Sequence, residues 1–177
     1  MDAGILLFLQ DVVRNPVLTP IFKGITTLGN GAVLWILISL VLLLFRKTRT
    51  VGITSILALL VSLVINNIVL KNLVARVRPY EVIEGLVLII QKPWDYSFPS
   101  GHTGSSFAAA WVFYRKLPKR FGIPALVLAG LIGLSRLYLG VHYPTDVLFG
   151  VFSGIGSGCI ALLIMKAVID KREKTGA

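Results

Sequence analysis

Long apolar runs separated by short charged stretches are the dominant pattern of this chain. The runs cover residues 25–45, 51–70, 103–117, 121–139 and 145–169, and the third of them is short and begins with polar residues. A helix needs about twenty predominantly apolar residues to cross the hydrocarbon core of a bilayer. The pattern therefore predicts an all-α fold, a polytopic transmembrane helical bundle with about five spans.

Residues 1–24 show a weaker apolar pattern at helical spacing. Apolar residues recur at Ile5, Leu6, Leu9, Val12 and Val13, and polar or helix-breaking residues interrupt them at Asp11, Arg14, Asn15 and Pro16. An interrupted amphipathic segment of this kind favours a helix lying in the membrane interface. If the segment crosses the membrane instead, the bundle has six spans.

Composition supports a membrane protein made of a single domain, residues 1–177. Mean hydropathy is +0.83 and only 15% of the residues are charged, which points away from a soluble globule. The basic residues form short clusters between apolar runs rather than one continuous face, so nucleic acid is not an expected partner. Cys159 lies in an apolar run, which predicts a buried packing thiol rather than a disulfide. No obligate protein partner is evident.

The distribution of charge predicts how the spans are oriented. Eleven of the 18 basic residues follow the first, third and fifth spans: Arg46, Lys47, Arg49, Arg115, Lys116, Lys119, Arg120, Lys166, Lys171, Arg172 and Lys174. These three ends lie on one side by alternation, and the positive-inside rule makes that side cytoplasmic. We therefore expect an integral plasma membrane protein with its N-terminus outside and its C-terminus inside. The compact chain suggests a bacterial source.

His142 and Asp146 stand four residues apart at the start of the fifth span. If a helix begins here, this spacing puts the imidazole and the carboxylate on one face, within hydrogen-bond reach. A carboxylate that accepts from Nδ1–H leaves Nε2 free as a base or nucleophile. Alternatively, Asp146 is merely an acidic residue in the first turn of a helix.

Further polar groups converge on the same, extracytoplasmic membrane level. Lys71 and Arg78 lie near the outer end of the second span, and Arg136 lies near that of the fourth. Taken singly, each could be a basic side chain that snorkels to the interface. Together, three cations have one assured carboxylate, Asp146, with Glu81 and Glu84 as possible partners from the loop. This excess of positive charge predicts a bound polyanion, best a phosphate.

The sequence Pro99-Ser100-Gly101-His102 at the start of the third span predicts a second device for binding an anion. A serine cap begins a helix whose free N–H groups attract anions. Gly101 lets the backbone approach the anion without a Cβ in the way.

Three motifs in this order resemble the signature of the type 2 phosphatidic acid phosphatase superfamily, which also contains the vanadium haloperoxidases. The motifs are Lys71-(six residues)-Arg78-Pro79, then Pro99-Ser100-Gly101-His102, then Ser135-Arg136-(five residues)-His142-(three residues)-Asp146. The resemblance covers Lys71 to Asp146 directly and, through the order of spans, nearly the whole chain.

The resemblance implies a role for each motif residue. His142 would attack phosphorus and form a phosphohistidine, Asp146 would hold its ring, and His102 would protonate the leaving oxygen. The phosphate would be bound by Lys71, Arg78, Arg136 and the backbone N–H groups of Ser100 and Gly101. Ser135 could add a hydrogen bond, whereas Arg76 falls outside the motif and is expected to anchor a loop or the interface. No metal or other cofactor is implied, and the sequence has no carboxylate cluster to hold a metal.

These features favour a metal-independent phosphatase that acts on a membrane lipid phosphate. The outward-facing site favours undecaprenyl diphosphate, with phosphatidylglycerophosphate and phosphatidic acid as alternatives. A haloperoxidase is disfavoured because those enzymes of the resembled superfamily are larger and soluble. A non-catalytic lipid-binding protein would be expected to lack His102, His142 or Arg136, and all three are present.

Overall fold

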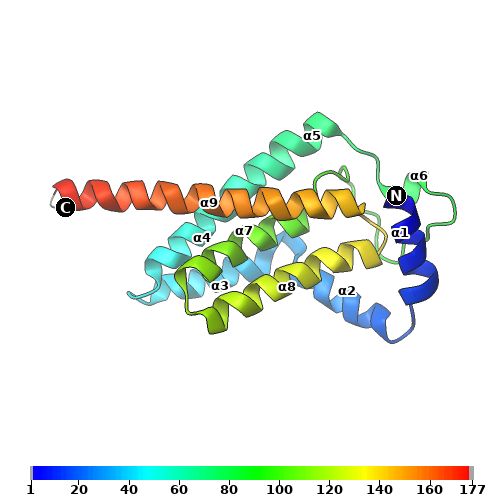
Figure 1. Ribbon diagram of the computed structural model, residues 1–177, viewed down its shortest axis with the longest axis horizontal. Helices are drawn as coiled ribbons and strands as arrows, with labels where there is room; N and C mark the ends of the chain where they lie inside the picture. The colour runs from blue at the N-terminus through cyan, green and yellow to red at the C-terminus, as the bar shows by residue number, and fades with distance from the viewer. Residues whose placement is uncertain (1, 176–177) are drawn as a thin grey trace.

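Every regular element of the described chain, residues 2–175 of the computed structural model, is a helix (Figure 1). The α-helices are α1 (Asp2–Phe8), α2 (Leu18–Leu28), α3 (Val33–Leu44), α4 (Arg49–Ser62), α5 (Lys71–Val74), α6 (Pro79–Val82), α7 (Gly101–Lys116), α8 (Lys119–Tyr138) and α9 (Pro144–Thr175). Short π- or 3-10-helical segments occupy Leu9–Val13, Asn30–Ala32 and Leu63–Leu70. The predicted all-α fold is confirmed.

Helix α7 lies inside the bundle, where it packs against α4, α8 and α9. Its middle is the small-residue stretch Ala108–Ala110, which is fully buried and lets the neighbouring helices approach closely. The indole of Trp35 on α3 donates a hydrogen bond of 2.9 Å to Ser106 on α7. A polar contact of this kind fixes the position of α7 where hydrophobicity alone would not.

Small residues also bring α9 against the start of α7. A Cβ added at Gly150 would lie 3.0 Å from the carbonyl oxygen of Ser100, so only glycine permits this approach without a shift. The contact places the beginning of α9, with Asp146, beside the residues that open α7. The long α9 then runs past the other helices to the C-terminal end (Figure 1).

The expected count of five or six spans is not confirmed. Three helical segments are long and apolar enough to cross a membrane, Arg49–Val82, Lys119–Tyr138 and Pro144–Lys174. A fourth membrane span is possible if α2 and residues Asn30–Leu44, which include α3, act as one span despite a bend of 47° at the short break between them. The predicted third span corresponds to α7, which has only 16 residues.

The N-terminal prediction is partly wrong. Residues 18–24, which we assigned to an interfacial helix, instead begin α2 and pack in the bundle beside α8. The helical path then bends at Gly31 and Ala32, which both have φ of 56°. The local sequence Gly29-Asn30-Gly31 is typical of a turn, whereas Ala32 is not a residue that favours a left-handed conformation.

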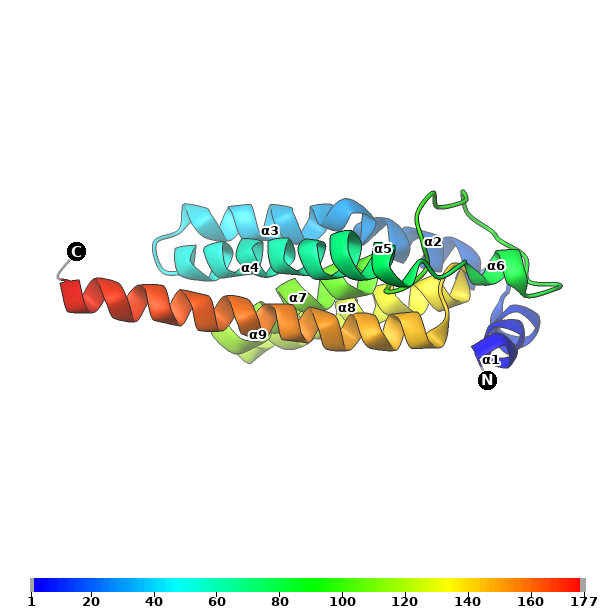
Figure 2. The ribbon, with the colours of Figure 1, turned by 90° about the horizontal axis from the view of Figure 1, so that it is seen from above.

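One end of the bundle is covered by the N-terminal segment and by the connection after α6 (Figure 2). Leu6 on α1, Leu86 in the connection and Tyr143 before α9 form a small buried cluster. Arg14 ties the same segments together, donating to the carbonyl oxygens of Tyr138 at 2.8 Å and Val87 at 2.7 Å. The covered end is the end at which the predicted site residues lie.

Candidate active site

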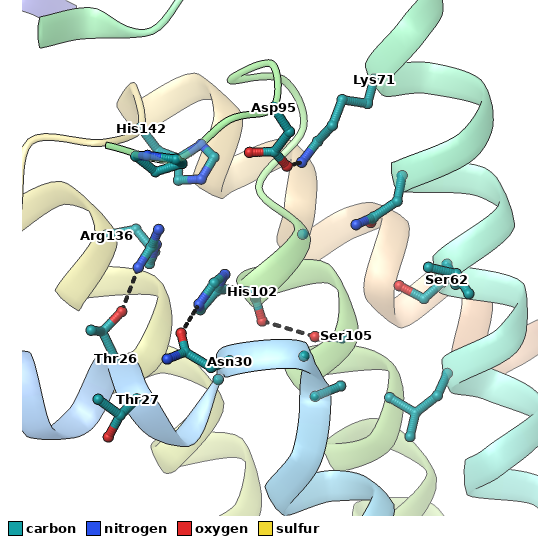
Figure 3. Close-up of a pocket in the computed structure, with 18 of the residues that line it drawn as sticks. Thr26, Thr27, Asn30, Ser62, Lys71, Asp95, His102, Ser105, Arg136 and His142 are labelled. Atoms are coloured by element: carbon teal, nitrogen blue, oxygen red, sulfur yellow. Dashed lines mark hydrogen bonds and ion pairs between the residues drawn. The ribbon is translucent and has the colours of Figure 1, made fainter. Parts of the chain in front are cut away.

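Most of the predicted site residues line one cavity of about 890 Å³ at the covered end of the bundle. They are Lys71, Arg78, Gly101, His102, Arg136 and His142. They come from four different parts of the chain, and Figure 3 shows several of them around a common space. The predicted convergence of cations and histidines at one level is therefore found in the structure.

His142 lies in the turn between α8 and α9, held by Asp146. The turn depends on Gly140, whose φ is +74°, a conformation that glycine adopts without strain. The Asp146 Oδ2 atom lies 3.5 Å from His142 Nδ1, which is longer than a standard hydrogen bond but directs the carboxylate at that nitrogen. Ser97 Oγ at 2.5 Å and the Tyr143 amide at 3.0 Å donate to the same oxygen and fix the carboxylate.

The His142 imidazole is neutral and has a cation beside its second nitrogen. Burial, together with the charges of Arg78 and Arg136, lowers the pKa of His142 to about 3 against the opposing effect of Asp146. His142 Nε2 lies 3.4 Å from Arg78 Nη1. A neutral imidazole has a lone pair, so the ring is chemically ready to act as a nucleophile or base at neutral pH.

Asp95 is the site residue that sequence reasoning missed. Its carboxylate forms an ion pair with Lys71 (Figure 3). It forms a second ion pair with Arg78 Nη2 at 2.6 Å. Burial raises the pKa of Asp95, but the hydrogen bonds and charges of these two cations outweigh it and bring the pKa down to about 2. The inference that Asp146 is the only assured carboxylate near the cations is therefore wrong.

Arg136 and His102 are each positioned by residues near the bend between α2 and α3. Arg136 Nη1 donates to Thr26 Oγ1 at 2.6 Å, and its buried Nε has no hydrogen-bond partner among the described residues. His102 Nε2 lies 2.9 Å from Asn30 Oδ1 (Figure 3). The irregular Asn30–Ala32 segment thus helps to position the site, a role that no spacing in the sequence indicates.

Ser100 does not occupy its predicted position. It is fully buried outside the lining of the cavity, and its amide donates to the backbone carbonyl of Asp146 at 3.2 Å instead of facing an anion. Its hydroxyl accepts from the Thr103 amide, which confirms the predicted helix cap. Ser135 is likewise buried, and its hydroxyl donates to the Ile132 carbonyl at 2.6 Å.

Arg76, expected to anchor a loop or the interface, instead contacts the site directly. Its Nη1 atom donates to Asp146 Oδ1 at 2.7 Å, and its guanidinium lies 3.7 Å from the centre of the Tyr143 ring. Its Nη2 atom also pairs with Asp2 at 3.2 Å, which attaches the N-terminus to the site. Arg76 therefore helps to fix the carboxylate that faces His142.

Arg76→Gln is expected to lower kcat by about 10- to 100-fold, because one charge-assisted hydrogen bond to Asp146 is lost. Asp2→Asn is the matched control, since it removes the other ion pair of Arg76 and leaves the Asp146 contact intact. Steady-state kinetics on a lipid phosphate would distinguish the two variants. Equal losses of activity in both would show that Arg76 only tethers the N-terminus.

The cavity continues from the polar groups into an apolar region between helices. This part is lined by Ile36 and Leu40 of α3 and, from α4 and the segment that follows it, by Ile56, Leu59, Leu60 and Leu63. An apolar cavity that ends at a cluster of cations matches an amphipathic molecule with an anionic head group.

Within residues 2–175, no three His, Cys, Asp or Glu side chains are grouped so that they could hold a metal ion. The charged groups that line the cavity are instead mostly side-chain cations. Lys71, Arg78 and Arg136 present ammonium and guanidinium donors, which match phosphate in charge and geometry.

Similarity to known proteins extends over nearly the whole chain. Residues 33–170 match the profile of the PAP2 superfamily. The undecaprenyl-diphosphatase of Sulfolobus acidocaldarius is 36% identical over 120 residues, which are 68% of this chain and 58% of that protein. Phosphatidylglycerophosphatase B of Bacillus subtilis is 34% identical over 176 residues, which cover 92% of this chain and 81% of that protein.

Solved structures show the same similarity in the fold. The crystal structure of Aquifex aeolicus LpxE has a TM-score of 0.80 and 31% identity, covering 91% of this chain and 94% of that one. The crystal structure of a transmembrane PAP2 type phosphatidylglycerolphosphate phosphatase from Bacillus subtilis has a TM-score of 0.74 and 30% identity, covering 96% of this chain and 85% of that one.

Proposed function

Since this chain belongs to the PAP2 superfamily and is an integral membrane phosphatase, we propose that it hydrolyses a lipid phosphate or diphosphate through a phosphohistidine at His142. One observation supports this most strongly. His142 Nε2 lies beside Arg78, in a cavity where cations meet an apolar passage between helices. The nucleophile, the phosphate-binding groups and the space for a lipid tail therefore adjoin one another.

In the first step, His142 Nε2 attacks phosphorus and the bond from phosphorus to the leaving oxygen breaks. His102 donates a proton to that oxygen, so that the lipid leaves as an alcohol or, from a diphosphate, as a monophosphate. Arg78 and Arg136 stabilise the charge that develops on the non-bridging oxygens. Asp146 stabilises the positive charge that the His142 ring acquires.

In the second step, water attacks the phosphohistidine. His102 accepts a proton from this water, the bond between phosphorus and Nε2 breaks, and inorganic phosphate is formed. His142 returns to its neutral form. The same cations serve both steps, because the charge on phosphorus passes through a similar arrangement in each.

The orientation of the site supports a substrate presented at the outer membrane surface. The turns α3–α4 and α7–α8 and the end of α9, which carry the basic clusters, lie at the end of the bundle opposite the site (Figure 1). The positive-inside rule places that end in the cytoplasm and the site outside. With α2–α3 as one crossing and α7 as another, five crossings put the N-terminus outside.

Among outward-facing lipid phosphates, the proposed substrate is undecaprenyl diphosphate, and phosphatidylglycerophosphate and phosphatidic acid are the alternatives. A relative named for each of the first two activities aligns with this chain. The apolar lining from α3 and α4 can accommodate the hydrocarbon chain of any of these three lipids.

A panel of purified lipid phosphates, assayed in detergent with excess chelator, tests the proposal. We expect release of phosphate in the chelator, with the highest kcat/KM for undecaprenyl diphosphate. A higher kcat/KM for phosphatidylglycerophosphate or phosphatidic acid would assign that lipid as the substrate instead. Loss of activity that magnesium restores would contradict the proposed mechanism.

A further inference from the structure

We propose that Asp95 is an internal competitor for the phosphate site: its carboxylate holds the Lys71–Arg78 pair and is displaced when a phosphoryl group binds there. The inference rests on the proposed function, because it takes these two cations as ligands of the phosphoryl group. A carboxylate and a phosphoryl group offer similar oxygens to an ammonium and a guanidinium. They therefore compete for the same donors.

The hydrogen bonds of Arg78 show why binding requires a displacement. Its Nε donates to the Asp95 carbonyl at 2.8 Å, its Nη1 to the Val141 carbonyl at 2.7 Å, and its Nη2 to the Asp95 carboxylate at 2.6 Å. The guanidinium has five N–H groups, and the remaining two make only long contacts, from Nη1 to His142 Nε2 and from Nη2 to the Tyr96 carbonyl, each at 3.4 Å. A phosphoryl group beside His142 can replace the long contact of Nη1, but it gains the short charge-assisted hydrogen bond from Nη2 only where the Asp95 carboxylate withdraws.

Asp95 is the acceptor that can withdraw. Val141 is fully buried in the tight turn between α8 and α9, where its own amide donates to the Arg136 carbonyl at 3.2 Å. The Asp95 side chain is 26% exposed and belongs to the long connection between α6 and α7, which contains no helix. Moving the aspartate disturbs little of the packed bundle, whereas moving Val141 would disturb the turn that carries His142.

Asp95 lies between two cavities, and this position suggests a route by which inorganic phosphate leaves the site. The cavity with the apolar passage and a second cavity of about 800 Å³ are both lined by Lys71, Arg78 and the segment Pro93–Asp95. The second cavity lacks the apolar residues of α3 and α4 and is lined instead by groups such as Arg76, Glu81 and Lys92. When Asp95 returns to the cations, it expels inorganic phosphate, and the second cavity offers a polar route away from the lipid.

The proposal predicts whether one substitution strengthens or weakens phosphate binding. Asp95→Asn keeps the shape of the side chain and removes its charge, so phosphate meets a weaker competitor and binds more tightly. If Asp95 merely positioned Lys71 and Arg78 for the phosphoryl group, the same substitution would weaken phosphate binding. Glu84→Gln is the matched control, because it makes the same charge change in the same connection.

The inhibition constants of inorganic phosphate and orthovanadate, measured for the three proteins, test the inference. We expect Asp95→Asn to lower both by about tenfold or more, the effect of removing one competing charge-assisted interaction, and Glu84→Gln to leave them unchanged. Unchanged or raised constants in Asp95→Asn would overturn the inference while leaving the proposed function in place. If neither anion inhibited any of the three proteins, including the unsubstituted one, the proposed phosphate site would be overturned as well.

A second measurement uses the unsubstituted protein and so does not depend on whether Asp95→Asn folds. Trp94 is adjacent to Asp95 and its side chain is 97% exposed. Saturating orthovanadate is expected to change the part of the tryptophan emission that is absent in Trp94→Phe. Emission that stays constant while orthovanadate inhibits fully would show that Asp95 remains in place, and would contradict the proposal.

Discussion

Replacing His142 with asparagine is expected to lower kcat by about 10⁴-fold or more, because the nucleophile is removed. Asparagine keeps a polar side chain in a position that is only 1% exposed, so the variant should fold. Phosphate release from a lipid phosphate, measured under saturating substrate, gives kcat. Thermal unfolding in detergent measures the fold independently.

The matched control is Thr145→Ala, a residue in the first turn of α9 that does not line the cavity. Its hydroxyl contacts Arg76 and Asp2 at the edge of the site, so only a small loss is expected. If His142→Asn retained turnover within about tenfold of the unsubstituted protein, the covalent step would be excluded.

Replacing Arg136 with lysine is expected to lower kcat/KM by about 10²- to 10³-fold, the usual effect of losing a donor to a developing oxyanion. Arg136 is held by Thr26 through Nη1, and its buried Nε has no acceptor within residues 2–175. Lysine keeps the charge but cannot bond to Thr26 and the phosphoryl group with the same planar geometry. The charge alone is therefore insufficient.

Arg120→Lys is the control for Arg136→Lys, since it makes the same change at the opposite end of α8. Its activity should not change. Thr26→Val should show an intermediate loss, because Arg136 remains but its guanidinium loses its fixed position. Equal activity of Arg136→Lys and the unsubstituted protein would remove Arg136 from the phosphate site.

The long helices could be predicted from the sequence because the apolar runs that form them are local. The fourth run, expected at residues 121–139, is α8 over Lys119–Tyr138, and the helix cap at Ser100 is where its motif places it. The convergence of Lys71, His102, Arg136 and His142 could also be predicted, because alternating spans bring every second helix end to the same side.

The rest of the site depends on contacts that no spacing in the sequence records. Asp95 meets Lys71 across 24 residues and Thr26 meets Arg136 across 110 residues, through a connection and a bend whose paths are set by tertiary packing. The same holds for Asn30, which reaches His102 only because the helix bends at Gly31 and Ala32. The Ser100 amide differs from its predicted role for a related reason. The approach of α9 brings the Asp146 carbonyl to it as an acceptor, so the amide does not face the cavity.

The sequence predicts five or six spans, whereas three or four helical segments have the length and hydropathy of a span, because apolar periodicity does not distinguish a helix enclosed by others from one that faces lipid. Helix α7 is apolar enough to be read as a span, but its alanine-rich middle is enclosed by α4, α8 and α9. A helix shielded by others in this way need not have the length or hydropathy of one that faces lipid.

Trapping of a covalent intermediate tests the central claim most directly. The protein is mixed with a lipid phosphate carrying a labelled terminal phosphoryl group, quenched in alkali within a single turnover, digested and analysed by mass spectrometry. The account predicts an acid-labile, alkali-stable phosphoryl group on His142, formed by the unsubstituted protein and absent from His142→Asn. Release of phosphate without any labelled peptide containing His142, or a label on another residue, would contradict it.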